Sequence, residues 1–119
     1  MSVVTNVILH YSMFGPAYLA KVNEFFGDRS GFVSVDDESL PRGWYGGSKY
    51  LECDLAIGAF NHLDLDGLVR HLCSLPEPEE DAGEVQLMVL EQEEFRFRII
   101  NIADVRAAGM RNADETASE

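Results

Sequence analysis

Positively charged side chains are scarce in this chain. Of its 119 residues, 9 are Lys or Arg and 21 are Asp or Glu, so the formal net charge is −12. Nucleic acids and anionic lipids attract proteins through cationic surface, and this composition therefore argues against nonspecific binding to either. An excess of acids instead favours solubility or the attraction of a basic protein partner.

Cysteines and long hydrophobic runs are also few. Cys53 and Cys73 are the only cysteines, too few for a disulfide framework, and both fall in apolar-patterned segments. No apolar run approaches the roughly 18 residues that a membrane-spanning helix needs. The first residues lack the cationic start and the cleavage site of a secretory signal. We therefore expect a cytoplasmic protein without a transmembrane segment.

Apolar residues are plentiful enough for one ordinary hydrophobic core. They make up 46% of the chain, which is typical of a globular protein. We expect a single α+β domain over residues 1–105 and a mobile acidic tail over residues 106–119. The segment from Ala103 onward is expected to begin as a short helix.

The spacing of the apolar residues predicts seven secondary-structure elements. Period-two patterns predict strands at Val3–Leu9, Gly31–Asp37, Tyr50–Phe60, Val85–Leu90 and Phe95–Ile100. Three-and-four spacing predicts a helix from Pro16 to Phe26, stopped by Gly27, and another over Leu65–Leu75 with a capping box at Asn61 and Asp64. The order βαββαββ predicts a two-layer ferredoxin-like sandwich, in which both helices cover one face of an antiparallel sheet.

Alternation also predicts which strand residues face the core. In the Tyr50–Phe60 strand the inward set is Leu51, Cys53, Leu55, Ile57 and Ala59. In the last two strands the inward set is Val85, Leu87, Val89, Phe95, Phe97 and Ile99, and the outward set is Gln86, Met88, Leu90, Arg96, Arg98 and Ile100. An outward face that mixes apolar and charged groups is typical of an interface. A homodimer, a different protein partner and a solvated monomer remain as alternatives.

The connection from Asp36 to Ser48 is the first candidate binding site. It is longer than most links between strands, and long links often carry function. Arg42, Trp44 and Tyr45 would anchor a protein partner or a stacking ligand, because aromatic residues and Arg concentrate binding energy. The structural alternative is that Trp44 folds back to cap the end of the core and that Gly46 and Gly47 supply the backbone freedom for the turn. These glycines lack the spacing of a phosphate-binding loop.

Acidic residues gather in two further segments. Asp36 and Asp37 precede the Trp44 loop, and Glu77–Glu94 holds eight acids without a Lys or Arg, among them Glu79, Glu80 and Asp81. Such acids either form solvated loops or steer a cationic protein into contact.

Groups suited to catalysis or metal binding do not converge in the sequence. Glu52 and Asp54 share a face of the predicted strand, as paired acid–base carboxylates do, but such pairs more often line a solvated face that Arg96 and Arg98 could reach. His62, Asp64 and Asp66 would align as metal ligands only in a strand, and the predicted helix cap separates them. The remaining candidates, His10, His71, Cys53 and Cys73, lack metal-ligand spacing. We assign no catalytic residue, cofactor or metal.

The leading hypothesis is therefore a small acidic protein-binding module, bacterial in style, that occludes a basic protein as an immunity or inhibitor protein does. Its binding residues would be Asp36, Asp37, Glu79, Glu80 and Asp81 for steering, Trp44, Tyr45 and Arg42 for anchoring, and Met88 and Leu90 on the sheet face. The main alternative is a regulatory domain that senses a small molecule under the Gly43–Gly47 loop. A small enzyme that uses Glu52, Asp54 or His10 ranks last.

Overall fold

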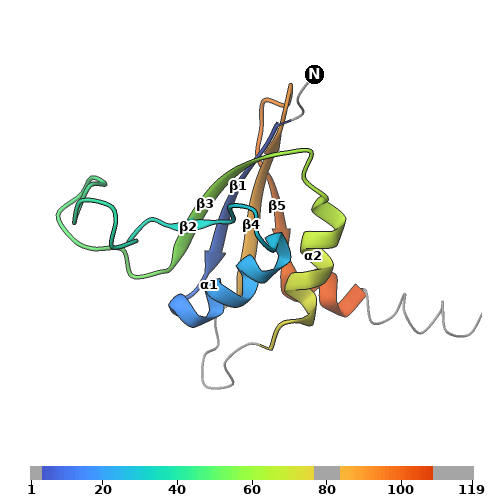
Figure 1. Cartoon of the computed structure of the whole chain (residues 1–119), viewed down its shortest axis with the longest axis horizontal. Coiled ribbons are helices and arrows are strands. Elements are labelled where there is room, and N and C mark those ends of the chain that lie inside the picture. Colours follow the sequence, from blue (N-terminus) through green and yellow to red (C-terminus); the bar gives the residue numbers. More distant parts are fainter. Residues whose placement is uncertain (1–3, 77–83, 109–119) are drawn as a thin grey trace, which may run out of the picture.

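The computed structural model describes residues 4–76 and 84–108 of the chain. Its elements follow the order β1 (Val4–Tyr11), α1 (Pro16–Asn23), the short 3₁₀ helix η1 (Glu24–Phe26), β2 (Val33–Ser34), β3 (Leu55–Asn61), α2 (Leu65–Ser74), β4 (Val85–Glu91) and β5 (Arg98–Asn101). A helical segment follows at 102–108, where the sequence predicts a short helix. The protein belongs to the predicted α+β class (Figure 1).

The five strands form one antiparallel sheet in the order β2-β3-β1-β4-β5. β1 is the central strand and pairs along most of its length with β3 on one side and β4 on the other. Its β-branched and apolar residues suit a strand with neighbours on both sides. Alternate residues of β1 are buried, namely Thr5, Val7, Leu9 and Tyr11.

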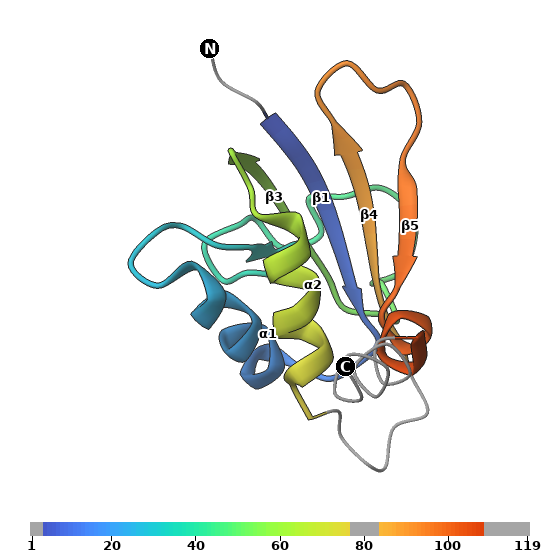
Figure 2. The same cartoon turned by 90° about the vertical axis from the view of Figure 1, so that its right-hand side faces the viewer.

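One hydrophobic core joins the helices to the sheet. The buried side chains of α1 (Tyr18, Leu19 and Val22) and of α2 (Leu68 and Leu72) belong to the same cluster as those of β1 and β4. The two helices lie beside each other (Figure 2), and the ring nitrogen Nε2 of His71 lies 2.8 Å from the carbonyl oxygen of Lys21. The core thus ties both helical connections to the central strands.

The start of α1 depends on a carboxylate that lies far away in the sequence. Pro16 occupies the first turn, and Gly15 before it has a φ of 87°, a conformation that favours glycine. The backbone N–H of Gly15 donates a 2.8 Å hydrogen bond to Oδ2 of Asp54. Asp54 therefore holds the entry to α1 against the beginning of β3, and Gly27, with a φ of 60°, follows η1 at the predicted stop.

The predicted inward face of the third strand is wrong. β3 begins at Leu55 rather than Tyr50, and its fully buried residue is Ala56, whereas Ile57 is 44% exposed. The pairing with β1 explains the difference, because Ala56 lies opposite Leu9 and Ile57 opposite Ile8. A shift of one residue turns every side chain of a strand to the other face.

Small residues on β3 make room for aromatic side chains. Gly58 and Phe60 share the inward face with Ala56, and the ring of Phe60 stacks on that of Phe26 at 4.7 Å between centroids. Phe32 packs edge-on against both rings. The aromatic rings of Phe26, Phe32 and Phe60 therefore fill the space that the small residues Ala56 and Gly58 leave on the inward face. The larger Leu55 and Ile57 lie on the opposite face.

The predicted inward face of the last strand is also wrong. Val85, Leu87 and Val89 of β4 are buried as predicted, but Phe95, Phe97 and Ile99 are 97%, 42% and 61% exposed. β5 starts only at Arg98, and Ile100, predicted to face outward, pairs with Leu87 and packs against the core. The pairing of β4 with β5 sets this alternation, because Leu87 lies opposite Ile100 and Met88 lies opposite Ile99. The even-numbered residues of β5 therefore share the face of the odd-numbered residues of β4.

The cap of α2 provides a test of local stability. Asp64, rather than Asn61, is the N-cap, and its Oδ1 accepts a 3.0 Å hydrogen bond from the N–H of Gly67. We expect Asp64→Ala to lower the free energy of unfolding by about 1 kcal/mol, because an unpaired N–H is left in the first turn. Asp64→Asn keeps a cap oxygen and should retain most of the stability. Urea denaturation measures both, and equal losses in the two variants would contradict the cap.

Candidate functional site

The connection between β2 and β3, residues 35–54, projects from the sheet (Figure 1). We call it the 35–54 loop. It is longer than the predicted link because β3 begins only at Leu55. The loop carries five of the predicted binding residues, Asp36, Asp37, Arg42, Trp44 and Tyr45, and the structure brings them together on one projecting segment.

Trp44 is both tethered and exposed. Its indole Nε1 donates a 2.6 Å hydrogen bond to the carbonyl oxygen of Val35, and 49% of the residue remains accessible. The ring helps to line a pocket of about 250 Å³ formed by Val33, Ser34, Leu40, Pro41, Trp44 and Ile57. Trp44 thus packs at the β2 edge of the sheet and still presents apolar surface, and its role as an anchor for a partner stays a prediction.

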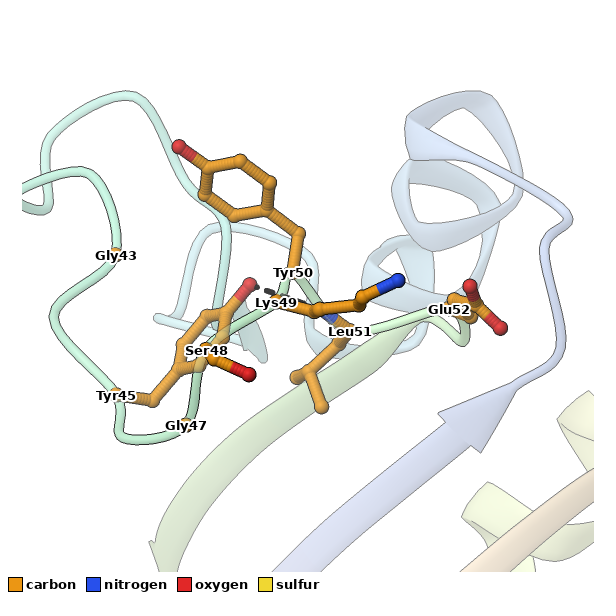
Figure 3. A pocket seen from close by; sticks show the side chains of 8 residues that line it. All are labelled: Gly43, Tyr45, Gly47, Ser48, Lys49, Tyr50, Leu51 and Glu52. Atoms are coloured by element: carbon orange, nitrogen blue, oxygen red, sulfur yellow. Dashed lines mark hydrogen bonds between the residues drawn. The ribbon is translucent and has the colours of Figure 1, made fainter.

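Tyr45 holds the two ends of the 35–54 loop together. Its hydroxyl donates a 3.1 Å hydrogen bond to Oδ1 of Asp36. It also accepts a 3.2 Å bond from the N–H of Leu51, which Figure 3 shows. Its ring contacts Trp44 edge-on, with 6.0 Å between the centroids. Tyr45 therefore helps to position Trp44 within the loop.

A pocket of about 620 Å³ lies along the second half of the loop. Its lining residues are Gly43, Tyr45, Gly47, Ser48, Lys49, Tyr50, Leu51 and Glu52 (Figure 3). Gly43 and Gly47 have φ values of 68° and 100°, a conformation that favours glycine. The turn role predicted for Gly46 and Gly47 is therefore supported at Gly47, and Gly43 is a second position that needs glycine. The guanidinium of Arg42 lies 5.1 Å from the centre of the Tyr50 ring, within the range of a cation–π contact.

Three exposed acids, Asp36, Asp37 and Glu38, begin the loop. They line a second pocket of about 410 Å³ together with Arg42 and Tyr50. Oδ2 of Asp37 accepts hydrogen bonds from both the hydroxyl and the N–H of Ser39, and these bonds lower the pKa of Asp37. The other predicted steering acids, Glu79, Glu80 and Asp81, lie outside the described residues.

The outward face of the sheet differs from the predicted one. Met88 and Leu90 lie on it as predicted, opposite Ile8 and Asn6 of β1. Arg98 instead pairs with Val89 and forms an ion pair with Glu91 at 3.1 Å, so it does not share the face of Met88. Cross-strand pairing places Val33, Ile57, Ile8, Met88 and Ile99 in one line, which we call the apolar row.

Most of the apolar row is not predicted from the sequence. Ile57 and Ile99 are predicted to lie in the core because they are large and their strands alternate apolar with polar residues. The signal that would have placed them is Ala56 and Gly58, whose small side chains leave room for Phe26 and Phe60 on the inward face. That signal is meaningful only when the register with β1 is known.

The candidate catalytic and metal-binding residues are dispersed. Glu52 is exposed in the large loop pocket, whereas Asp54 binds the N–H of Gly15, and neither meets Arg96 or Arg98. Asp64 caps α2. Within residues 4–76 and 84–108, no three His, Cys, Asp or Glu side chains are grouped so as to hold a metal ion.

The remaining histidine and cysteine candidates are partly buried. His71 contacts the Lys21 carbonyl, and Nδ1 of His10 is buried without a hydrogen-bond partner in the described part of the chain. Cys53 and Cys73 are free thiols, and burial raises the pKa of Cys73, which disfavours its thiolate. None of these groups pairs with another to form a nucleophile and base among the contacts described.

Comparisons of this chain with protein-family models, with curated proteins and with solved structures give no match. In the described ranges, no helix has the length and apolar character needed to cross a membrane. The 35–54 loop and the outward sheet face are therefore the two features from which a function can be argued.

The hydrogen bonds of Asp37 lead to a testable pH effect. Ser39→Ala should raise the pKa of Asp37 toward its ordinary value, because it removes the hydroxyl that donates a hydrogen bond to the ionised carboxylate. The backbone N–H of residue 39 still donates to the carboxylate, so part of the lowering should remain. In the wild type these bonds are lost as the pH falls through the lowered pKa. NMR titration of the Asp37 carboxyl carbon measures the change, with Ser48→Ala as a control in the same loop. An unchanged pKa in Ser39→Ala would contradict the assignment.

Fluorescence of Trp44 tests the exposure and charge of the loop. It is the only tryptophan, so its emission reports on this site alone. We expect caesium ions to quench it more than iodide at low salt, because the three loop acids attract cations. The difference should shrink in D36N/D37N/E38Q, the loop-charge variant, whose amide oxygens can still accept the bonds of Tyr45 and Ser39.

A matched control removes three exposed acids elsewhere, E24Q/D28N/D104N, and should keep the caesium preference of the wild type. If the control variant lost the preference as fully as the loop-charge variant, the effect would come from net charge rather than from the loop.

Proposed function

We propose that this protein binds a basic protein partner and occludes part of its surface, in the manner of an inhibitor or immunity protein. The observation that carries the proposal is the 35–54 loop, which presents exposed acids and the half-exposed Trp44 on one projecting segment. This arrangement supports a protein-binding site, because it combines charge that can steer a partner with an apolar side chain that can anchor it.

The steering role belongs to the acids. Asp36, Asp37 and Glu38 are exposed side by side at the start of the loop, and the lowered pKa of Asp37 further favours its ionised carboxylate. In a chain of net charge −12 they create a negative potential that raises the association rate of a cationic protein at low salt. Glu79, Glu80 and Asp81 would add to this potential.

The anchoring role belongs to Trp44, with Tyr45 and Arg42 in support. The hydrogen bond to Val35 and the edge contact with Tyr45 fix the indole before any partner arrives, so little side-chain freedom is lost on binding. Arg42 lies on the Tyr50 ring and offers a guanidinium edge beside the acids. A large, fixed aromatic side chain with a polar rim resembles the hot spots of known interfaces.

The finer description of the fold is part of the proposal. A split βαβ unit joins its strands through two helical connections, and the order β2-β3-β1-β4 with helices after β1 and β3 supports a ferredoxin-like sandwich that β5 extends. A shared core for α1 and α2 supports their placement on one face. The two free cysteines are consistent with the proposed cytoplasmic location. The fold alone implies no activity.

Affinity capture tests the proposed binding. The tagged protein should retain a basic protein from a lysate of its own cells at low salt and release it at high salt. The loop-charge variant should recover several-fold less of that protein, and the control variant should recover it in full. With the captured protein purified, Trp44→Ala should weaken the equilibrium affinity about tenfold or more, as loss of an anchor does.

Two results would contradict the proposal. One is capture that does not change in the loop-charge variant, which would place the contact elsewhere. The other is the absence of any salt-sensitive partner together with thermal stabilisation by a small molecule.

The second result would favour a small-molecule sensor, the alternative function. The pocket of about 620 Å³ is the observation that supports it, since its volume is in the range of known ligand sites. A ligand there would lie against Tyr45 and Tyr50, with Lys49 and Glu52 available for charged groups (Figure 3). Tyr50→Ala should then abolish the stabilisation by that ligand without changing the unfolding temperature of the free protein appreciably.

A further inference from the structure

The apolar row crosses the whole width of the sheet without interruption. Each member lies directly opposite the next, from Val33 on β2 through Ile57, Ile8 and Met88 to Ile99 on β5. Val33, Ile57 and Ile99 are 46%, 44% and 61% exposed. Exposed apolar groups that adjoin one another, unlike scattered ones, mark a contact surface.

The face around the apolar row is free of charge. The other described strand residues that share it are Val4, Asn6, His10, Leu55, Ala59, Asn61, Gln86, Leu90 and Asn101, none of which is an Asp, Glu, Lys or Arg. This is unusual in a chain of net charge −12 in which 25% of the residues are charged. A basic partner would find no acid to pair with on this face.

We propose that the outward sheet face binds a second copy of this chain in a two-fold symmetric dimer. Two acidic copies repel each other wherever their acids meet, and an uncharged face allows contact without like charges opposed. A two-fold interface brings the same patch of both copies together. Ile8 lies at the middle of the apolar row on the central strand, so the two-fold axis passes close to it.

The two ends of the apolar row have complementary shapes. At the β5 end Ile99 protrudes, whereas at the β2 end Ile57 and Val33 form an apolar pocket of about 250 Å³ with Trp44 and Pro41. A two-fold axis parallel to β1 lays the β5 end of each copy over the β2 end of its partner. Each Ile99 then enters the pocket of the other copy. Because both pockets are filled in this way, the assembly is complete with two chains.

The size of the face suits a small specific interface. Strands spaced about 4.8 Å apart and rising about 3.4 Å per residue give a face on the order of 500 Å² per copy, or about 1,000 Å² for the pair. The dimer uses the side of Trp44 that lines the pocket with Ile57, so it shares Trp44 with the proposed basic partner. It does not depend on Asp36, Asp37 or Arg42.

Sedimentation equilibrium tests the dimer on the purified full chain. The wild type should have twice the 13.3 kDa monomer mass at high concentration. Ile57→Glu and Ile99→Glu, at opposite ends of the apolar row, should each raise the dissociation constant about 100-fold, because two like charges are buried in the contact. Both residues are already exposed in the monomer, so the variants should fold, as circular dichroism would verify.

Phe95→Glu is the matched control, since Phe95 is 97% exposed at the β4–β5 connection and lies outside the apolar row. It should leave the dissociation constant unchanged. High salt should leave the dimer intact or strengthen it, whereas it releases the proposed basic partner, so failure of one proposal is distinguishable from failure of the other.

Three results would overturn the dimer. They are a monomeric wild type at every concentration, a dimer that Ile57→Glu and Ile99→Glu leave unchanged, and a dimer that Phe95→Glu weakens equally. A monomer that instead loses a different bound protein on Ile57→Glu would show that the face takes a heterologous partner.

Discussion

The register of β1 between β3 and β4 is the constraint on which the rest of the structure depends. Leu9 lies opposite both Ala56 and Leu87, and Ile8 lies opposite both Ile57 and Met88. Because paired residues point to the same side, these two positions of one strand decide which residues of its neighbours are buried. The core under α1 and α2 and the apolar outer face are two consequences of a single alignment.

The sequence is sufficient to predict the order of the elements and the buried face of β4, where Val85, Leu87 and Val89 alternate with other side chains. It is insufficient for β3, because small residues pack inward there while Leu55 and Ile57 point outward. The face of β5 is also predicted wrongly, because it is set by the pairing of Leu87 with Ile100 and of Met88 with Ile99. In both strands the deciding factor is pairing with a distant segment, which local periodicity does not contain. The N-cap of α2 is a local feature, since Asp64 accepts its hydrogen bond from Gly67 three residues later. The predicted capping box is nevertheless displaced, because it begins at Asn61.

The residues of the candidate site are predictable from the sequence, whereas their contacts are not. Composition and loop length are enough to single out Asp36, Asp37, Arg42, Trp44 and Tyr45, since long links rich in aromatic and charged residues often bind partners. Their contacts are not predictable in this way. The bond from Trp44 to Val35 and those from Tyr45 to Asp36 and Leu51 depend on the path of the loop. Asp54, considered for catalysis, instead fixes the start of α1.

The shortness of the outermost strands limits how this protein can aggregate. β2 has two residues and β5 has four, so each outermost strand by itself offers few unpaired backbone groups to a strand from another molecule. Trp44 and Pro41 also lie close beside β2. Stacking of strands from chain to chain, the route by which many β-rich proteins form fibres, therefore has little template on these two strands.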